Sequence, residues 1–556
     1  MMRNHFLVLA ASAALTACGG GGGGSNPPPP ATAVSYHHYS GVPSASSAVG
    51  GLFSVSSASP LTPATVDSNA LATDYPPVPA AARRSYTVDT GTLDALTGTI
   101  NNYRSFAVVY AANGRLYKQY ADQAPAPVQI SNVSTITAGL GNGLAGSSAT
   151  DLCYLNVVTD FANPDNSIIV YGLAGANLTC GNLDDTYAWL RLNTSTSTAP
   201  TALTSFLPVA PVYGGAGAIT NLLVLDGTGA LVKLDANFSG VPTPITGGGG
   251  PFPFTVNDKD IWVTHLSQTR ILLLMPGAGA AGELRIVDAS ANTLTGVLGS
   301  IANRAAWSLG FSYNKDSSFI YFVGNDAAGT PAGIIQRFPV DGSSVATTFH
   351  NAGAVQINSL FLTTNHVVYW VGTSSIASIP KAGGAVVPLA TSGAGELIFP
   401  YGVSNTGYVY YDRVFAFPNT TMSDRAQAIR DDGTGLVTYG ASNGAQWSGF
   451  NYVTAFNLFR EFPYFDHLVV AEYAAAATTM AGSTLSVVSA GSAAKNGTVV
   501  GTVPAGIQTI FGFVYGGTRG LWEGYDGDQE MFYVDTAVAG SLTRVTTDSA
   551  NQQLIE

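Results

Sequence analysis

Short strand-forming segments that alternate with tight-turn dipeptides dominate this chain. Residues 106–110, for example, lead through Asn113-Gly114 into residues 115–120. Apolar runs bounded by Asn-Gly or Asp-Gly are a strong signal for β-hairpins. Equivalent hairpins begin near residues 167, 221, 270, 319, 366, 408, 468 and 521. Because almost no helical periodicity accompanies them, the sequence predicts an all-β fold.

The spacing of these hairpins predicts a repeat architecture. Successive hairpins lie roughly 45–60 residues apart, a period typical of β-propeller blades. Residues 52–66 form a tenth candidate hairpin. We predict a single ring of about eight four-stranded blades, with a range of seven to ten, because a hairpin can be the inner or the outer half of a blade. Two tandem propellers are the alternative, with a boundary at Gly247–Gly250.

Two segments resemble the repeats of known propellers. Residues 311–322 are similar to a strand pair of Tol-type propellers, with Tyr313 and Asn314 in place of the usual Pro-Asp. Residues 367–389 resemble the YWTD-type propeller repeat, although Val371-Gly372 stands where that family has Thr-Asp. The resemblance implies a β-propeller body, which we place at residues 49–556.

The N-terminus has the features of an export signal. Arg3 precedes an apolar stretch at residues 6–17, which ends at Cys18. Residues 15–18, Leu-Thr-Ala-Cys, resemble the lipobox of bacterial lipoproteins. The resemblance implies that residues 1–17 are removed as a signal peptide and that Cys18 is lipidated. Several acyl chains on one residue would anchor the protein firmly to a membrane.

A transmembrane helix is the alternative for this segment, but the apolar stretch is shorter than the ~20 residues that span a bilayer. Six glycines, Gly19–Gly24, follow directly and do not continue a helix. Gly19 stands where the lipoprotein family usually has Asp as its inner-membrane retention signal, so we predict the outer membrane. The glycines and the four prolines at residues 27–30 make residues 18–48 a lipidated tether.

Composition excludes one class of partner. Charged residues make up only 10% of the chain, against about a quarter in ordinary soluble domains. The formal charge is −12, with 22 Lys and Arg among 556 residues and no basic cluster. Nucleic-acid binding requires such a cluster for phosphate contacts. The hydrophobic share of 46% is sufficient for a large core.

Two cysteines remain after Cys18. Cys153 and Cys180 are an even pair in a protein predicted to be exported, which favours a disulfide. A loop of this length would contribute about 3 kcal/mol to stability by the chain-entropy estimate. Two buried free thiols are the alternative.

One acidic motif is a candidate metal site. Asp526, Asp528 and Glu530 place three carboxylates at alternate positions, and Ca²⁺ prefers oxygen-rich loops of this kind. The motif lacks the length and the terminal bidentate glutamate of a calcium loop. A polar hairpin tip is therefore the alternative, and no other cofactor is predicted.

The sequence contains no convincing catalytic motif. Residues 440–444 spell Gly-x-Ser-x-Gly around Ser442, but that chemistry requires a helix after the serine, and residues 446–453 are strand-like. The remaining histidines are scattered over the predicted tether and strands: His37, His38, His265, His350, His366 and His467. Propellers can bring such residues together at their axis, so a metal site there remains an alternative to structural roles.

These observations predict a binding or scaffold module of the cell envelope. The predicted partners are the membrane, through the lipid anchor, and an envelope protein or glycan, and the chain is expected to be monomeric. An enzyme of the polysaccharide lyase or hydrolase type, with its site at the propeller axis, is the alternative function. A Ca²⁺-stabilised, adhesin-like surface protein is a third.

Overall fold

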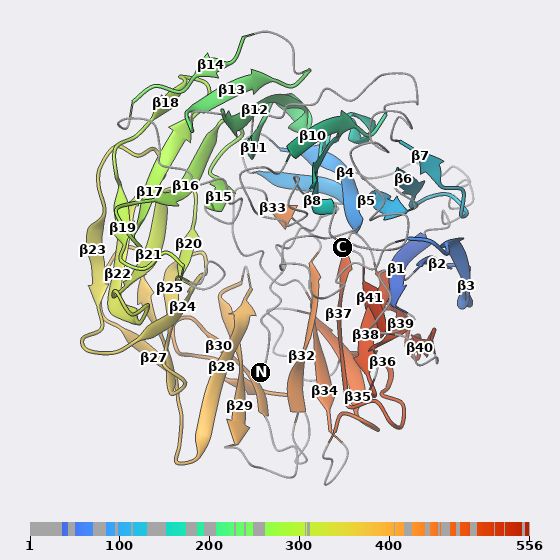
Figure 1. The fold of residues 1–556 in the computed structure, drawn as a ribbon. Helices are drawn as coiled ribbons and strands as arrows, with labels where there is room; N and C mark the ends of the chain where they lie inside the picture. Colours follow the sequence, from blue (N-terminus) through green and yellow to red (C-terminus); the bar gives the residue numbers. More distant parts are fainter. Residues whose placement is uncertain are drawn as a thin grey trace, which may run out of the picture.

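The computed structural model is an all-β ring (Figure 1). The structure describes residues 36–42, 51–70, 85–94, 98–112, 115–130, 152–173, 186–193, 207–226, 229–237, 241–247, 262–305, 307, 312–404, 406–415, 425–439, 445–453, 456–457, 467–473, 479–489, 497–515, 518–527, 529–546 and 551–554. Within these residues the only helical segments are two short 3-10 turns, η2 (Pro164–Asn166) and η3 (Gly215–Gly217). No described helix has the length and apolar character needed to cross a membrane.

Nine blades consist of strands that follow one another in the described chain. Blades 1 to 3 are β4 (Ser85–Leu93), β5 (Thr99–Ala112), β6 (Arg115–Tyr120) and β7 (Val128–Gln129); β8 (Leu152–Val158), β9 (Ile168–Leu173) and β10 (Thr186–Arg191); and β11 (Leu207–Tyr213), β12 (Ile219–Leu225), β13 (Leu231–Asp235) and β14 (Thr243–Pro244). In each blade the first strand is innermost and the sheet grows outward.

Blades 4 to 6 repeat this pattern. They are β15 (Trp262–His265), β16 (Arg270–Pro276), β17 (Gly282–Asp288) and β18 (Thr293–Leu294), with β19 (Gly299–Ile301) also on β17; β20 (Tyr313–Lys315), β21 (Phe319–Asn325), β22 (Pro331–Pro339) and β23 (Thr347–Asn351); and β24 (Ile357–Leu362), β25 (His366–Val371), β26 (Ser375–Pro380) and β27 (Val387–Thr391).

Blades 7 to 9 complete the series. They are β28 (Glu396–Val403), β29 (Tyr408–Phe415), β30 (Arg425–Arg430) and β31 (Val437–Thr438); β32 (Ala445–Val453), β34 (His467–Glu472), β35 (Thr484–Ser489) and β36 (Thr498–Thr502); and β37 (Thr509–Tyr515), β38 (Arg519–Tyr525), β39 (Gln529–Asp535) and β40 (Thr543–Arg544). The short β33 (Phe456–Asn457) pairs with β5.

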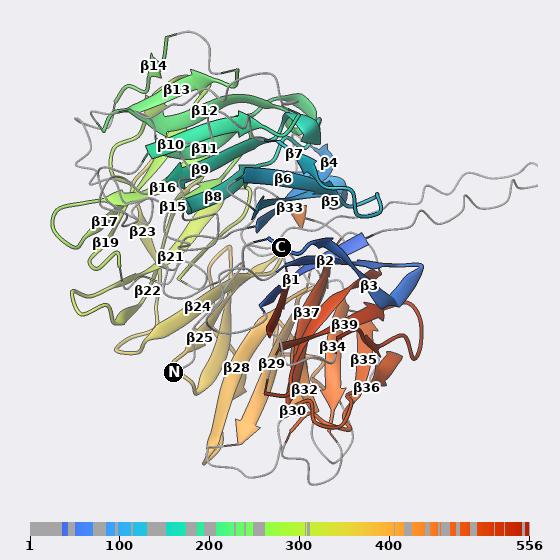
Figure 2. The ribbon, with the colours of Figure 1, turned by 45° about the vertical axis from the view of Figure 1, so that its right-hand side comes forward.

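A closing blade joins the two ends of the described chain. Its innermost strand is β41 (Asn551–Leu554), followed by β1 (Tyr36–Val42), β2 (Leu52–Ser56) and β3 (Ser59–Asp67). The β41 strand pairs antiparallel with β1 from Tyr39↔Leu554 to Val42↔Asn551. In both ribbon views this blade lies between blade 1 and blade 9 (Figures 1 and 2).

The β1 strand corrects the predicted tether boundary. Residues 36–42 were expected within the tether, and the propeller was expected to begin at residue 49. Instead these residues form a strand with partners on both sides. The segment Tyr-His-His-Tyr-Ser has no alternation of apolar and polar residues, although Tyr39 packs in the apolar cluster between the closing blade and blade 9.

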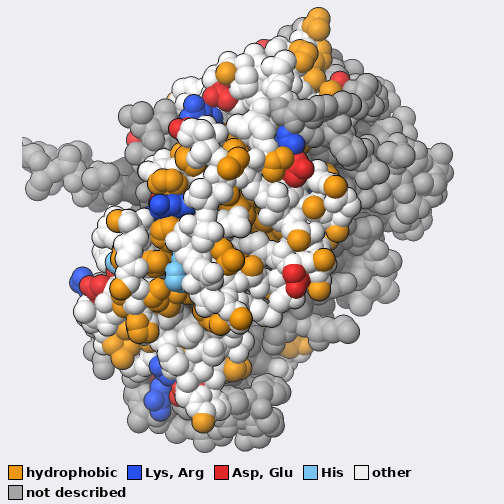
Figure 3. Space-filling model, turned by 90° about the vertical axis from the view of Figure 1, so that its left-hand side faces the viewer, with side chains coloured by type: hydrophobic (Ala, Val, Ile, Leu, Met, Phe, Trp, Pro, Cys, Tyr) orange, Lys and Arg blue, Asp and Glu red, His pale blue; other side chains and the backbone are white. Residues whose placement is uncertain are grey.

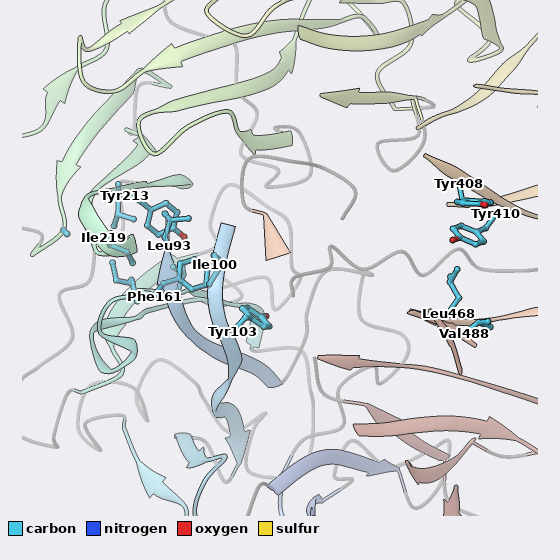
Figure 4. Close-up of a cluster of buried hydrophobic side chains, with 14 of the residues drawn as sticks. Leu93, Ile100, Tyr103, Phe161, Tyr213, Ile219, Tyr408, Tyr410, Leu468 and Val488 are labelled. Carbon is cyan, nitrogen blue, oxygen red and sulfur yellow. The ribbon is translucent and has the colours of Figure 1, made fainter. Parts of the chain in front are cut away.

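Apolar clusters at every junction between neighbouring blades close the ring. Leu52, Val66 and Ala70 of the closing blade pack against Val108 and Tyr110 of blade 1. Similar clusters fill the other junctions, from blades 1 and 2 round to blade 9 and the closing blade. Figure 4 shows the cluster that contributes to two junctions, as one group from blades 1 to 3 and another from blades 7 and 8.

This arrangement confirms the predicted all-β propeller and the single ring. The nine blades of consecutive strands and the closing blade fall within the predicted range of seven to ten and above the central value of eight. Each of the nine hairpins recognised in the sequence forms the second and third strands of one blade. These strands were the easiest to recognise because both of their faces are covered; in β16, for example, residues 271–275 are all buried.

The two faces of the ring differ in the turns that they carry. Because neighbouring strands of a blade are antiparallel, the turns between its first and second strands and between its third and fourth strands lie at the same end. We call this end the a–b face. The opposite end, the b–c face, carries the turns between second and third strands and the connections from one blade to the next.

Candidate functional site

The innermost strands of blades 3 to 6 carry a belt of buried polar side chains. β11, β15, β20 and β24 form the inner side of these blades (Figure 1). Lys315, on β20, is only 2% exposed. Its Nζ donates hydrogen bonds to the Thr264 hydroxyl oxygen, at 2.8 Å, and to the backbone carbonyl of His265. A lysine thereby joins blade 5 to blade 4.

The environment of Lys315 disfavours its charged form. Burial holds the pKa of this lysine well below its usual value. The reason is that the free energy lost when an ammonium leaves water exceeds the free energy gained from hydrogen bonds to two neutral acceptors. A depressed pKa is a property of amines that act as bases or nucleophiles. The Lys315 amine is enclosed by protein, however, and this arrangement fits a structural tie between blades.

His265 continues the belt toward blade 3. Its Nε2 lies 2.8 Å from the carbonyl oxygen of Pro211, on β11, and its ring lies 5.3 Å from the ring of Tyr213. Burial lowers the pKa of His265 to about 4, so the ring is neutral near pH 7. On the other side of the belt, the Asn314 amide donates to the carbonyl of Leu360 in blade 6, at 3.3 Å.

A second set of ties starts from the third strands. The Lys118 ammonium donates to the carbonyl of Leu192 at 3.0 Å, which joins blade 1 to blade 2. Lys233 donates to the carbonyl of Ala289 at 2.7 Å, which joins blade 3 to blade 4. In the same way, Arg337 of blade 5 donates to the carbonyl of Lys381 in blade 6 at 3.1 Å. In all three cases a long cationic side chain reaches the backbone that follows the third strand of the next blade.

A third tie lies in the turns of the a–b face between blades 6 and 7. His366 Nδ1 lies 3.0 Å from Asp431 Oδ2, and the Thr363 hydroxyl donates to the same oxygen at 2.5 Å. The Ser378 hydroxyl donates to the backbone carbonyl of Asp431. A Ser, a Thr, a His and an Asp are therefore close together, but each of them takes part in the contact between blades 6 and 7.

The structure places two of the three predicted metal ligands beside a cation of the protein itself. The guanidinium of Arg544 lies 2.7 Å from Asp526 Oδ2 and 3.1 Å from Glu530 Oε1. The Thr546 hydroxyl donates to Glu530 at 2.6 Å. Asp528 lies outside the described residues. Within the described part of the chain no group of three or more His, Cys, Asp or Glu side chains is arranged to hold a metal, and the Ca²⁺ site stays a prediction.

The described histidines do not meet at the axis. His37 and His38 lie on β1, at the closing blade. His350 lies 3.1 Å from the Tyr369 hydroxyl, and His265 and His366 make the blade ties described above. His467 is on β34, and its side chain lies outside the described residues, as does the whole segment around Ser442.

The cysteine predictions also fall outside what the structure describes. Cys18 and Cys180 are not among the described residues, and of Cys153 only the backbone is described, on β8. Lipidation of Cys18 and the disulfide both stay predictions.

Sequence reasoning missed the inner belt. Lys315 lies within residues 311–322, the segment that resembles a Tol-type repeat, but nothing in that segment shows that its amine reaches a neighbouring blade. The available signal was a lysine on a short strand just before the apolar run of residues 319–323. A cation at such a position must find acceptors when the strand is buried.

Comparisons with known proteins return distant similarities only. The chain matches no protein-family model, and no curated protein sequence is similar to it. Among solved structures, the putative TolB from Agrobacterium tumefaciens has 16% identity and a TM-score of 0.23, over 42% of this chain and 80% of that one. BamB from Moraxella catarrhalis has 12% identity and a TM-score of 0.31, over 70% and 96%. Prolyl oligopeptidase B from Galerina marginata has 11% identity and a TM-score of 0.33, over 84% and 57%.

Proposed function

We propose that this chain is a lipid-anchored β-propeller of the outer membrane that binds or scaffolds a protein or glycan partner in the cell envelope. The observation that carries the proposal is the way the described polar side chains are used. Lys315, His265, His366 and Asp431 are the groups most suited to chemistry, and each one ties neighbouring blades together.

A ring built in this way supports recognition better than catalysis. The inter-blade ties and the apolar junctions hold neighbouring blades of the described chain together. Loops on a rigid scaffold are the usual place for binding residues. The enzyme alternative would need a nucleophile or a pair of carboxylates free to meet a substrate, whereas the four groups named above are all engaged between blades.

Crosslinking in intact cells tests this proposal. A tagged full-length protein is treated with a short crosslinker, and the captured molecules are identified by mass spectrometry, beside an unrelated lipoprotein and the Cys18→Ala variant. One reproducible envelope partner that is absent from the unrelated lipoprotein is the expected result. A capture pattern identical to that of the unrelated lipoprotein would contradict the scaffold function.

Membrane anchoring is tested separately by fractionation of the same cells. The full-length protein is expected in the outer-membrane fraction, and Cys18→Ala is expected to lose membrane association because the acyl chains are missing. Equal fractionation of the two proteins would contradict the lipid anchor without affecting the fold.

A further inference from the structure

The exposed apolar side chains of the described chain are concentrated at one edge of the ring. Eleven large hydrophobic residues are exposed. Eight of them lie at the start of a blade's outermost strand or in the turn before it: Leu61, Val128, Val241, Val345, Val386, Leu436, Val499 and Val538. We call this set the aliphatic rim. Val241 reaches 91% exposure, so these side chains are not shielded by their own blades.

The rim lies on the a–b face. The turn before a fourth strand is at the same end of the blade as the turn between the first and second strands. Seven of the nine blades and the closing blade contribute one described residue each. The three other exposed residues, Val355, Phe399 and Tyr525, lie away from these turns.

The chain enters the ring at this same face. β1 is the second strand of the closing blade, so its first residue lies at the a–b end. The backbone N–H of Tyr36 donates to the carbonyl of Ala121, at 2.9 Å, in the turn after the third strand of blade 1. The segment between Cys18 and Tyr36 therefore attaches to the face that carries the rim. Fully extended, it would span about 60 Å at most.

We propose that the a–b face docks onto a lipid bilayer, with the aliphatic rim inserted at the membrane interface. This inference rests on the proposed lipid anchor, which would hold the face close to the membrane. Transfer of exposed apolar side chains from water into the membrane interface lowers the free energy of the system. The net charge of −12 favours a zwitterionic over an anionic lipid surface.

The distribution of the rim favours a bilayer over a protein partner. Its residues are single aliphatic side chains, one to a blade, and they follow the circumference of the ring. Protein interfaces concentrate their energy in a compact central cluster, often aromatic or Arg. A fluid, flat bilayer imposes no such shape and can accept separate aliphatic groups. Figure 3 views the ring from its side, where hydrophobic side chains lie among polar ones and a few Lys, Arg, Asp and Glu side chains.

A matched pair of valines tests this orientation. Val345 and Val355 lie on either side of β23, at its a–b and b–c ends, and are 62% and 37% exposed. Each is replaced in turn by the photo-crosslinker p-benzoylphenylalanine in the full-length, lipidated protein. The protein is reconstituted on vesicles of phosphatidylcholine and phosphatidylethanolamine with a radiolabelled lipid, and label transferred to the protein is measured after illumination.

We expect several-fold more lipid crosslinking from position 345 than from position 355. Equal labelling, more labelling from 355, or crosslinks from 345 to a second protein chain in place of lipid would overturn the docking proposal. Co-flotation of the protein with the vesicles is scored in the same samples. Absence of flotation marks a failure of the lipid anchor, whereas flotation without the difference between the valines marks a failure of the docking face alone.

Discussion

Lys315 Nζ lies 2.8 Å from Thr264 Oγ1 and joins the innermost strands of two blades, β20 and β15, which do not pair with each other. Propeller blades contact each other mainly through apolar side chains, which are not directional. The hydrogen bonds of a buried amine to two acceptors are directional, so they constrain how the two blades are oriented relative to each other. The inner wall of blades 3 to 6 is therefore defined by hydrogen bonds as well as by packing.

Replacing Lys315 should change how stability depends on pH. Between the depressed pKa of the folded state and about 10.4, the unfolded chain holds a proton on this lysine that the native protein lacks. The free energy of unfolding of the wild type should therefore rise as pH increases through this range. Lys315→Met should remove this increment, and urea unfolding at about pH 7 and pH 9.5 measures the difference between the two proteins. Parallel pH profiles would mean that Lys315 stays charged when folded.

The histidines of β1 should make the protein sensitive to acid. Burial lowers the pKa of His37 to about 4 and that of His38 to about 3. Below about pH 6.5 the unfolded chain takes up protons that the native ring excludes, so each histidine reduces stability by about 1.4 kcal/mol per pH unit until its folded pKa is reached. His38→Gln should make the loss of stability between pH 6.5 and about 4 less steep. An unchanged slope in denaturant titrations would count against the buried neutral histidine.

Asp431 should contribute far more to the free energy of unfolding than its neighbour Asp432. Asp431 holds both His366 and Thr363 across a blade junction, whereas Asp432 is exposed and accepts hydrogen bonds within its own turn. Asp431→Ala removes the carboxylate that accepts from the Thr363 hydroxyl and lies 3.0 Å from His366 Nδ1, and we expect a loss of about 2–4 kcal/mol. Asp432→Ala should cost about 1 kcal/mol or less. Calorimetric melting of the two variants compares them, and equal losses would contradict the bridging role.

Removal of residues 551–556 should open the ring. These residues include β41, the innermost strand of the closing blade, so their loss exposes the edge of β1. A free edge strand promotes association with other chains. We expect a lower melting temperature and larger species in size-exclusion chromatography.

The matched control for this truncation removes residues 555–556 alone, which follow β41. It should behave as the wild type does. If the longer truncation also melts and elutes as the wild type, closure by β41 contributes little to the ring.

The repeat was readable from the sequence because the second and third strands of each blade are covered on both sides. β16 and its counterparts therefore appear as unbroken apolar runs ended by turn residues, such as Asp288, which accepts the N–H of Ser290. Half of the closing blade was recognised, because the tenth candidate hairpin, residues 52–66, forms β2 and β3. The other half was missed because β1 and β41, with Asn-Gln-Gln-Leu, are largely polar.

The polar ties were not readable, for a different reason. The acidic motif at Asp526 and Glu530 was recognised, but its partner Arg544 lies on another strand of the same blade. The partners of Lys315 lie about fifty residues away, in another blade. Such groups come together only in the folded ring, and their contacts cannot be predicted from a single sequence.

The ties formed by Lys233 and Arg337 end on peptide carbonyls and not on side chains. Lys118 likewise donates to a peptide carbonyl and in addition lies 3.5 Å from the Asp165 carboxylate. Every residue has such a carbonyl, so the hydrogen bond depends on the identity of the donor side chain alone. A substitution at the acceptor position leaves the hydrogen bond intact. Blades joined in this way can differ from one another in sequence while the ring stays closed.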